Sequence, residues 1–480
     1  MTPKVILIEF NELCPPLLQR WIADGTLPNF RRFYENSEIF TTDSDEHDPY
    51  KLEPWIQWYS LHTGLPFSEH GVFNLTDGPR QSHADVWQMG LRAGKRVGNM
   101  SSMNARGFQG PGSFYIPDPW ADEPAVYPEE LAPYVDFVSR QIQEHTAPGR
   151  ASISDTISFL GFLLGHGLRA RTVVQIARQL IAEKLSSRNK RWRRATLHDC
   201  LQLDVFLELY EKNKPDFCTF FSNSTAHYQH AYWRHMQPEQ FAIKPSATEL
   251  DEYGGAVRYG YQRMDSLLGD FFELERKHGA TLVLATAISQ QPYLDAEQRG
   301  GQLYYRPKDF AAFLASQGIV TSRIEPIMTA QYIVRCDDAE ATLAAATALR
   351  GFRLGDTEIF EVLQQGPTKL CVGNWIHHSV ADDATVTHVD GRSSLRYGEV
   401  FYQLPVMKSG RHHPDGVFWI KTGHHRVNEA RVPILSVLPT LLDLLGIDYN
   451  RSSLAKSLVP ARAQLSDQAQ QPTATGRYAA

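Results

Sequence analysis

Histidine and carboxylate side chains gather where the local pattern predicts the end of a strand or the start of a helix. His227 and His230 are three residues apart, directly after the apolar run at 217–221, so they share one face of a predicted helix. Two imidazoles at this spacing suit a metal ion or a phosphate group. The alternative is that His227 lies on the surface and Thr225 only caps the helix. We favour the functional interpretation, because these residues follow a buried strand.

Glu53 directly precedes Pro54 at the predicted start of another helix. Its carboxylate is suited to act as a nucleophile, a base or a replacement metal ligand, with Trp55 and Gln57 shaping a substrate pocket. The simpler interpretation is that Pro54 takes the first helical position and the helix dipole favours Glu53 beside it. The sequence leaves both interpretations open.

Neutral polar groups follow the apolar run at 281–285. Ser289 and Gln290 offer a hydroxyl and an amide, which can orient the hydroxyls of a sugar-like substrate or simply form a polar turn. Arg306 comes soon afterwards, and its guanidinium is suited to hold the charge of a phosphate.

The elements that must position these groups are strands and helices in alternation. Four short runs are continuously apolar, as is typical of strands buried on both faces of a parallel sheet: 5–8, 217–221, 281–285 and 417–420. Helical patterns lie between them. The sequence therefore predicts an α/β protein with a doubly wound, mostly parallel sheet flanked by helices, plus inserted helical and cap segments. Asn11 and Glu12 follow the first strand, so they should meet the other strand ends at one edge of the sheet.

Four segments carry recognisable motifs in order along the chain. They are Leu27-Pro-Asn-Phe30, Ser60-Leu-His-Thr-Gly64 with Pro66 and His70-Gly71, Lys408 to Gly416, and Leu438 to Gly446. Together they resemble the alkaline phosphatase superfamily, and in particular its nucleotide pyrophosphatase and type I phosphodiesterase branch. The resemblance spans nearly the whole chain and implies the superfamily's fold.

Members of that superfamily hold two divalent ions, usually zinc, with six carboxylate and imidazole ligands that activate a Ser or Thr nucleophile. The resemblance places these ligand positions partly on residues that cannot serve: Asn11, Ala226, Ala287 and Ile288. It leaves His230 and His412, both of one metal site, and puts the nucleophile near Glu53 or Pro54. We therefore expect at most one divalent ion, with a third ligand from Glu9, Glu12 or Glu53. The alternative is a metal-free site in which the imidazoles are acid–base or phosphate-binding groups.

These observations predict a divergent enzyme, a hydrolase or transferase that lacks the usual two-metal site. Its substrate would be a small-molecule or lipid-linked phosphorylated compound, such as a nucleotide sugar. The alternative is a catalytically dead binding or scaffold protein that uses the old phosphate pocket. The candidate residues are Glu53, Asn11 and His227 for catalysis, Glu12, Trp55, Gln57, Thr225, Ser289, Gln290, Arg306 and His413 for substrate binding, and His230 and His412 for the metal.

The chain of 480 residues is long enough for a large core with additions. We expect an alkaline-phosphatase-like core at 1–150, 200–310 and 400–458, a basic helical insertion at 151–199, a cap subdomain at 311–399 and a flexible tail at 459–480. The five cysteines form no CxxC pair, which fits reduced thiols and a cytoplasmic location. A net charge of −6 gives no global attraction to nucleic acid, so we expect no nucleic-acid partner.

The stretch 157–194 differs from the rest of the chain in charge. Between Gly165 and Arg194 nine basic residues stand against the single acid Glu183, next to an apolar run at 157–164. Two interpretations remain: a solvated helix face, or peripheral contact with an anionic membrane on its inner face or with an anionic polymer.

Overall fold

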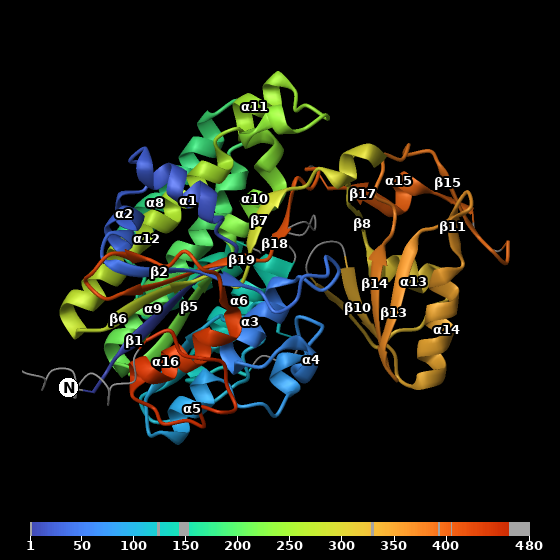
Figure 1. The fold of residues 1–480 in the computed structure, drawn as a ribbon. Coiled ribbons are helices and arrows are strands. Elements are labelled where there is room, and N and C mark those ends of the chain that lie inside the picture. The colour runs from blue at the N-terminus through green and yellow to red at the C-terminus, as the bar shows by residue number, and fades with distance from the viewer. Residues whose placement is uncertain are drawn as a thin grey trace, which may run out of the picture.

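The computed structural model describes residues 2–121, 125–143, 153–327, 331–391, 394–404 and 406–459. The predicted tail at 459–480 lies outside these residues apart from its first. The largest element is a nine-stranded sheet in the order β20-β2-β19-β6-β1-β5-β3-β4, with β21 beside β2 (Figure 1). Its strands are β1 (Val5–Phe10), β2 (Ser37–Asp43), β3 (Val97–Met100), β4 (Phe114–Ile116), β5 (Phe217–Ser222), β6 (Thr281–Ala285), β19 (Asp415–Lys421), β20 (Arg426–Val427) and β21 (Val432–Pro433).

Most neighbours in this sheet run parallel. β1 lies between β5 and β6 and is parallel to both, and β3 joins β5 to β4 in the same direction. Among the described strands of the sheet, β19 alone runs antiparallel, between β6 and β2. The carboxyl ends of β1, β5 and β6 therefore lie at the same edge, as the alternation of apolar runs predicts.

Helices cover both faces of the sheet, because successive side chains of each strand point to opposite sides. On β1, Ile6 and Ile8 join one apolar cluster, whereas Val5 and Leu7 join another. The first face packs against α1 (Pro15–Ala23), α2 (Pro28–Tyr34), α9 (Ala195–Asn213), α10 (Ser224–Met236) and α12 (Ala256–His278); the second packs against α3 (Pro54–Thr63), α5 (Val86–Arg92) and α16 (Val437–Leu445).

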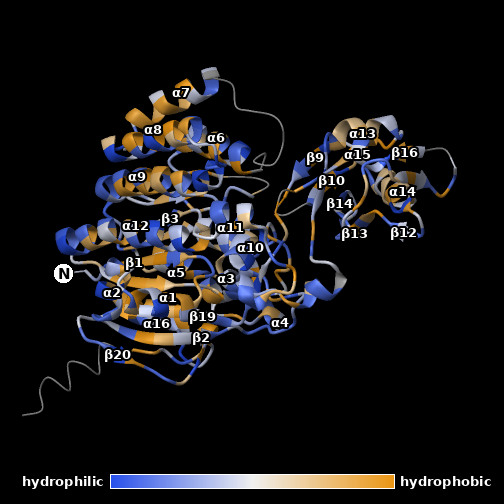
Figure 2. Cartoon of the chain, turned by 90° about the horizontal axis from the view of Figure 1, so that it is seen from above, coloured by the Kyte–Doolittle hydropathy of each residue, from blue (hydrophilic) through white to orange (hydrophobic). Residues whose placement is uncertain are grey.

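Further helices add an outer layer on the first face. These are α6 (Ala132–Gln143), α7 (Ile153–Leu164) and α8 (Ala170–Leu185), while the short α11 (Ala247–Tyr253) lies against α10. Figure 2 shows them stacked outward in the order α12, α9, α8 and α7. α7 and α8 thus lie farthest from the sheet on this side.

A second group of elements has its own apolar core, which runs in sequence from Tyr305 to Phe401 and is slightly wider than the predicted 311–399. It contains two antiparallel sheets of four strands each, in the orders β13-β14-β10-β9 and β12-β11-β15-β16. Its elements are β8 (Tyr305–Pro307), α13 (Phe310–Ser316), β9 (Arg323–Pro326), β10 (Gln331–Arg335), α14 (Ala339–Arg350), β11 (Phe352–Leu354), β12 (Thr357–Glu358), β13 (Phe360–Gly366), β14 (Lys369–Asn374), β15 (Thr385–His388), β16 (Ser394–Arg396), α15 (Tyr397–Val400) and β17 (Phe401–Gln403).

This group lies beside the large sheet (Figure 1) and is tied to it by side-chain contacts. Gln365 Nε2, for example, donates a hydrogen bond of 2.6 Å to Asn74 Oδ1. Across the described residues, none of the helices has the length and apolar character needed to cross a lipid bilayer.

Candidate functional site: a carboxylate and two imidazoles

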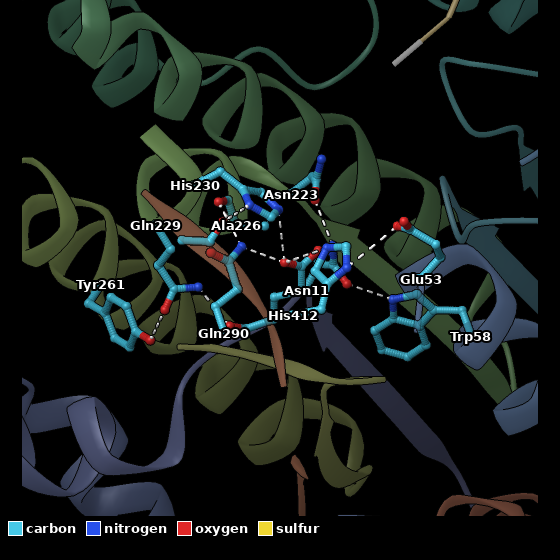
Figure 3. Close-up of polar contacts among 12 residues, drawn as sticks. Asn11, Glu53, Trp58, Asn223, Ala226, Gln229, His230, Tyr261, Gln290 and His412 are labelled. Carbon is cyan, nitrogen blue, oxygen red and sulfur yellow. Dashed lines mark hydrogen bonds and ion pairs between the residues drawn. The ribbon is translucent and has the colours of Figure 1, made fainter. Parts of the chain in front are cut away.

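Glu12, His230 and His412 meet at the carboxyl edge of the sheet (Figure 3). Glu12 follows β1, His230 lies in the second turn of α10, and His412 lies on β18 (Gly410–His413), which pairs with β7 (Ser289–Pro292). Glu12 Oε2 is 3.3 Å from His230 Nε2 and 3.6 Å from His412 Nε2. Among the described residues, these three form the one group of carboxylate, imidazole or thiol side chains with ligand atoms all within 4.8 Å of one another.

Glu12 occupies this position because its backbone turns sharply after β1. Its φ is 61°, in the left-handed region that non-glycine residues seldom adopt. A buried chain of hydrogen bonds holds the turn: Gln229 Nε2 donates to the Glu12 carbonyl at 2.7 Å, and the Tyr261 hydroxyl donates to Gln229 Oε1 at 2.8 Å. The same hydroxyl accepts the Cys14 N–H at 2.7 Å. Neither Gln229 nor Tyr261 carries a motif, and the sequence analysis missed both.

The Glu12 carboxylate is buried and ionised. Asn11 Nδ2 donates to its Oε1 at 2.8 Å, and Gln290 Nε2 donates to its Oε2. Burial by itself would raise the pKa of Glu12, but the charges of His412 and His230 and the hydrogen bonds outweigh it and lower the pKa to about 2. The two amides therefore orient a negative charge toward the two rings.

Both imidazoles present Nε2 to this carboxylate. His230 Nδ1 lies 2.9 Å from the Gly410 carbonyl, to which it donates, so Nε2 is left for a ligand. Burial lowers the pKa of His412 to about 3, although Glu12 acts in the opposite direction. His412 is therefore a neutral imidazole, which is the form that coordinates a metal ion.

A carboxylate with two neutral imidazoles fits one divalent ion. Three such ligands with a position left open are typical of catalytic zinc sites. Asn11, where the sequence resemblance puts a ligand, is hydrogen-bonded at both ends of its amide: Trp58 Nε1 donates to its Oδ1 at 2.8 Å, and its Nδ2 donates to Asn223 Oδ1 at 2.7 Å. Asn11 therefore orients the neighbouring side chains.

Two further charged groups border this cluster. Glu53 lies at the start of α3 with its Oε2 3.5 Å from His412 Nδ1, and 27% of its side chain is exposed. Burial raises the pKa of Glu53 to about 8, against the opposing charge of Lys408. The Lys408 ammonium forms no ion pair with any described residue. Burial would lower the pKa of Lys408, but Tyr304, Glu53 and other neighbours raise it, so this side chain stays charged.

The sequence analysis did not select Lys408 as a site residue. Its only signal is its place at the start of the loop that carries His412.

The structure places the other predicted site residues at varying distances from the cluster. Ser289 is buried opposite His413 on the β7–β18 pair, and His413 Nδ1 accepts the Asp415 N–H at 3.2 Å. Thr225 is buried in the first turn of α10, and its hydroxyl has no hydrogen-bond partner among the described residues.

Four predicted residues have contacts that point elsewhere. Trp55 Nε1 donates to the Phe73 carbonyl, and Gln57 Oε1 accepts the Asp45 N–H. His227 is exposed on α10. Arg306 is buried in the second group of elements, where it donates to the Ile327 carbonyl at 3.1 Å and lies over the Tyr332 ring.

Of the three acids considered as a third ligand, Glu9 faces away. Its Oε1 is 2.7 Å from His62 Nε2, beneath α3, and both side chains are buried. Strand alternation explains this placement, because Glu9 shares the face of Val5 and Leu7.

The family model of type I phosphodiesterases and nucleotide pyrophosphatases matches residues 5–295, which is more than half of the chain. The chain belongs to this family. The match covers Glu12, His230 and Glu53, and it confirms the family that the four motifs indicate. A search of curated proteins found no match.

Solved structures with a similar chain course include three enzymes or enzyme relatives. Phosphonoacetate hydrolase from Sinorhizobium meliloti 1021, solved with phosphonoacetate, is 13% identical, with 93% of this chain and 96% of that chain covered and a TM-score of 0.40. Human ectonucleotide pyrophosphatase/phosphodiesterase 5 is 11% identical, with 93% and 96% covered and a TM-score of 0.41. A mutant of alkaline phosphatase PafA is 14% identical, with 95% and 99% covered and a TM-score of 0.44. The predicted α/β fold with a mostly parallel sheet is confirmed.

Proposed function

We propose that this chain is a phosphoester hydrolase or transferase that works with one divalent ion in place of two. Membership of a phosphodiesterase family supports a hydrolase acting on a phosphoester. The observation that carries the one-ion proposal is the convergence of Glu12, His230 and His412, with His230 oriented by the Gly410 carbonyl. A divalent ion bound there would act as a Lewis acid toward a phosphoryl oxygen.

The second ion of the superfamily would lack ligands in this chain. Three positions that the resemblance assigns to ligands carry Ala226, Ala287 and Ile288, all buried and without a donor atom in the side chain. Neutral amides and hydroxyls surround them instead. An amide cannot replace the charge of an ion, so the negative charge of a substrate must be met by side chains of the chain itself.

Lys408 and Glu53 supply the remaining chemistry in this proposal. The Lys408 ammonium, free of ion pairs with described residues, attracts the phosphate and holds its charge. Glu53 lies 3.5 Å from His412 at the position that the resemblance gives to the nucleophile. We assign it the transfer of a proton: its protonated carboxyl donates to the leaving oxygen, and its carboxylate accepts a proton from an attacking hydroxyl or water.

The substrate class follows from the absence of a hydroxyl nucleophile. Direct transfer from an activated donor, such as a nucleotide sugar or a lipid-linked phosphate, needs no such hydroxyl. Ser289 and Thr225 are the neutral groups best placed to orient the donor's hydroxyls. Gln290 is engaged with Glu12 and the Ala226 carbonyl, which makes it a positioning residue.

The test combines a thermal-shift panel with turnover assays on purified protein. Nucleotide sugars and lipid-linked phosphates are screened for a rise in Tm, since a ligand of the folded state raises the apparent stability. For a donor that binds, Glu53→Gln should abolish turnover while the donor still raises Tm, whereas Glu69→Gln, at an exposed position, should change neither. Robust zinc-stimulated turnover of a nitrophenyl phosphodiester that is unaffected by Glu53→Gln would overturn the proposal.

A second candidate function is binding without catalysis. The observation that favours it is that both oxygens of Glu12 already accept a hydrogen bond from an amide, which satisfies the carboxylate without an ion. The same experiment separates the two: a donor that raises Tm in metal-free protein, with no turnover under any metal, supports the binding protein.

A further inference from the structure

The apolar side chains of α8 point away from the protein. Val173, Val174, Leu180, Ile181 and Leu185 are each at least 45% exposed. At 100° per residue these positions fall on one side of the helix. The side that faces the protein carries Thr172 and Gln179, which are buried, and the half-buried Gln175 and Glu183. An ordinary surface helix has the opposite arrangement, with its apolar stripe toward the core.

The preceding helix extends this apolar surface. On α7, Ile157, Leu160 and Leu164 are exposed at 64%, 38% and 73%, while Phe159 and Leu163 face inward. α7 and α8 together hold eight of the seventeen large hydrophobic side chains that are exposed among the described residues. Figure 2 shows the two helices at the outer edge of the stack, with no further element covering them. Apolar surface of this extent marks an interaction site.

Basic side chains border the apolar surface. Arg169 and Arg171 anchor the start of α8 by pairing with Asp270, and Arg194 pairs with Glu183. By contrast, Arg178, Lys184, Lys190 and Arg191 form no ion pair with any described residue.

A cavity of about 310 Å³ lies at the carboxyl end of α8. Leu180, Lys184, Arg188, Lys190, Arg191 and Arg194 line it together with Glu183 and Asn189. An apolar side chain, basic groups and a hollow of this size thus lie side by side.

We propose that α7, α8 and the turn to Arg194 bind the surface of an anionic phospholipid bilayer. The exposed leucines, isoleucine and valines enter the boundary between headgroups and acyl chains, and the unpaired lysines and arginines contact lipid phosphates and carboxylates. The cavity at the end of α8 receives one anionic headgroup.

Charge decides between a bilayer and a second copy of this chain. In a two-fold dimer through α8, the same surface would meet itself, so Arg178 and Lys184 would approach their own copies with no exposed acid on this side of α8 to offset them. Like charges so placed oppose association, whereas an anionic bilayer is complementary to them.

The test is co-sedimentation of the full chain with vesicles. One set contains phosphatidylcholine alone, and the other also contains about one third phosphatidylserine, an anionic lipid. One variant replaces Leu180, Ile181 and Leu185 with Ser, and a second replaces Lys184, Lys190 and Arg191 with Gln. Matched controls carry the same changes at exposed positions elsewhere: Val320, Leu343 and Leu363 to Ser, and Arg20, Arg92 and Lys456 to Gln.

We expect binding to the anionic vesicles that weakens as salt rises, because exposed charges are screened over about 8 Å at physiological ionic strength. Each basic side chain contributes about fivefold to the partition, so loss of three should reduce it on the order of 100-fold. The apolar variant should bind neither vesicle, and the controls should bind like the unchanged protein.

Failure of the unchanged protein to sediment with anionic vesicles would overturn the proposal, as would equal binding by the charge variant and its control. A dimer in light scattering that the Leu180, Ile181 and Leu185 variant dissociates, without vesicle binding, would assign the surface to a second copy instead.

Discussion

Tyr261→Phe tests the buried support of Glu12 without touching the cluster itself. The Tyr261 hydroxyl donates to Gln229 Oε1 at 2.8 Å and accepts the Cys14 N–H at 2.7 Å, and Gln229 in turn holds the Glu12 carbonyl. Removing the hydroxyl leaves two buried groups without partners while keeping the ring against Trp21. Each unpaired buried group costs about 1–3 kcal/mol, so the free energy of unfolding should fall by about 2–5 kcal/mol.

The same change should weaken metal binding. Loss of a partner that orients a ligand typically costs 10- to 100-fold in metal affinity, and we expect a reduction on the order of tenfold because Tyr261 acts through Gln229 and the backbone of Glu12. Urea denaturation measures the first effect, and competition with a zinc-binding dye measures the second.

Tyr259→Phe on the same helix is the matched control. Its hydroxyl is 3.3 Å from Thr196 Oγ1 in a half-buried setting, so its loss should cost less than about 1 kcal/mol and leave zinc affinity unchanged. If the two variants behave alike, or if Tyr261→Phe loses stability but binds zinc as before, the support that we assign to this network is wrong.

Two further predictions concern other buried positions. Burial raises the pKa of Asp118 to about 7, so its ionisation destabilises the fold as pH rises from 3.8 through 7; Asp118→Asn should therefore be more stable than the unchanged protein at pH 9, by up to roughly 4 kcal/mol, with the difference fading toward pH 4. A difference in Tm that stays constant with pH would refute this cause. A Cβ on Gly410 would lie 2.5 Å from the Gln229 carbonyl, so Gly410→Ala should displace β18, lower stability by about 1–3 kcal/mol and weaken zinc binding, whereas Gly366→Ala, with only a distant side-chain neighbour, should do neither. Equal zinc affinity in the two glycine variants would contradict this account of β18.

The fold and two members of the cluster could be predicted because their signals are local. Apolar runs separated by helical patterns determine the sheet, and His230 and His412 lie in short motifs beside strand ends. The third member could not be chosen among Glu9, Glu12 and Glu53 from the sequence. That choice depends on a left-handed turn at Glu12, and hydrogen bonds from residues more than 200 positions away hold this turn.

Arg306 illustrates the opposite limit. Its distance in sequence from Ser289 suggests a place in the cleft, yet the chain enters the second group of elements just before it. There the guanidinium packs against Tyr332, which follows it by 26 positions. Spacing along the chain carries no information about which of two cores a side chain will join. Lys408 shows the same in reverse, because its ammonium reaches the neighbourhood of Glu53 through the fold alone.

The most direct test of the central claim is the zinc content of the purified protein, measured by elemental analysis after loading with zinc and removal of the excess. We predict one tightly bound ion per chain, lost in Glu12→Gln, His230→Ala and His412→Ala and retained in His424→Ala, an exposed histidine outside the cluster. Two ions per chain, or one ion that survives the loss of His230 and His412, would contradict the account.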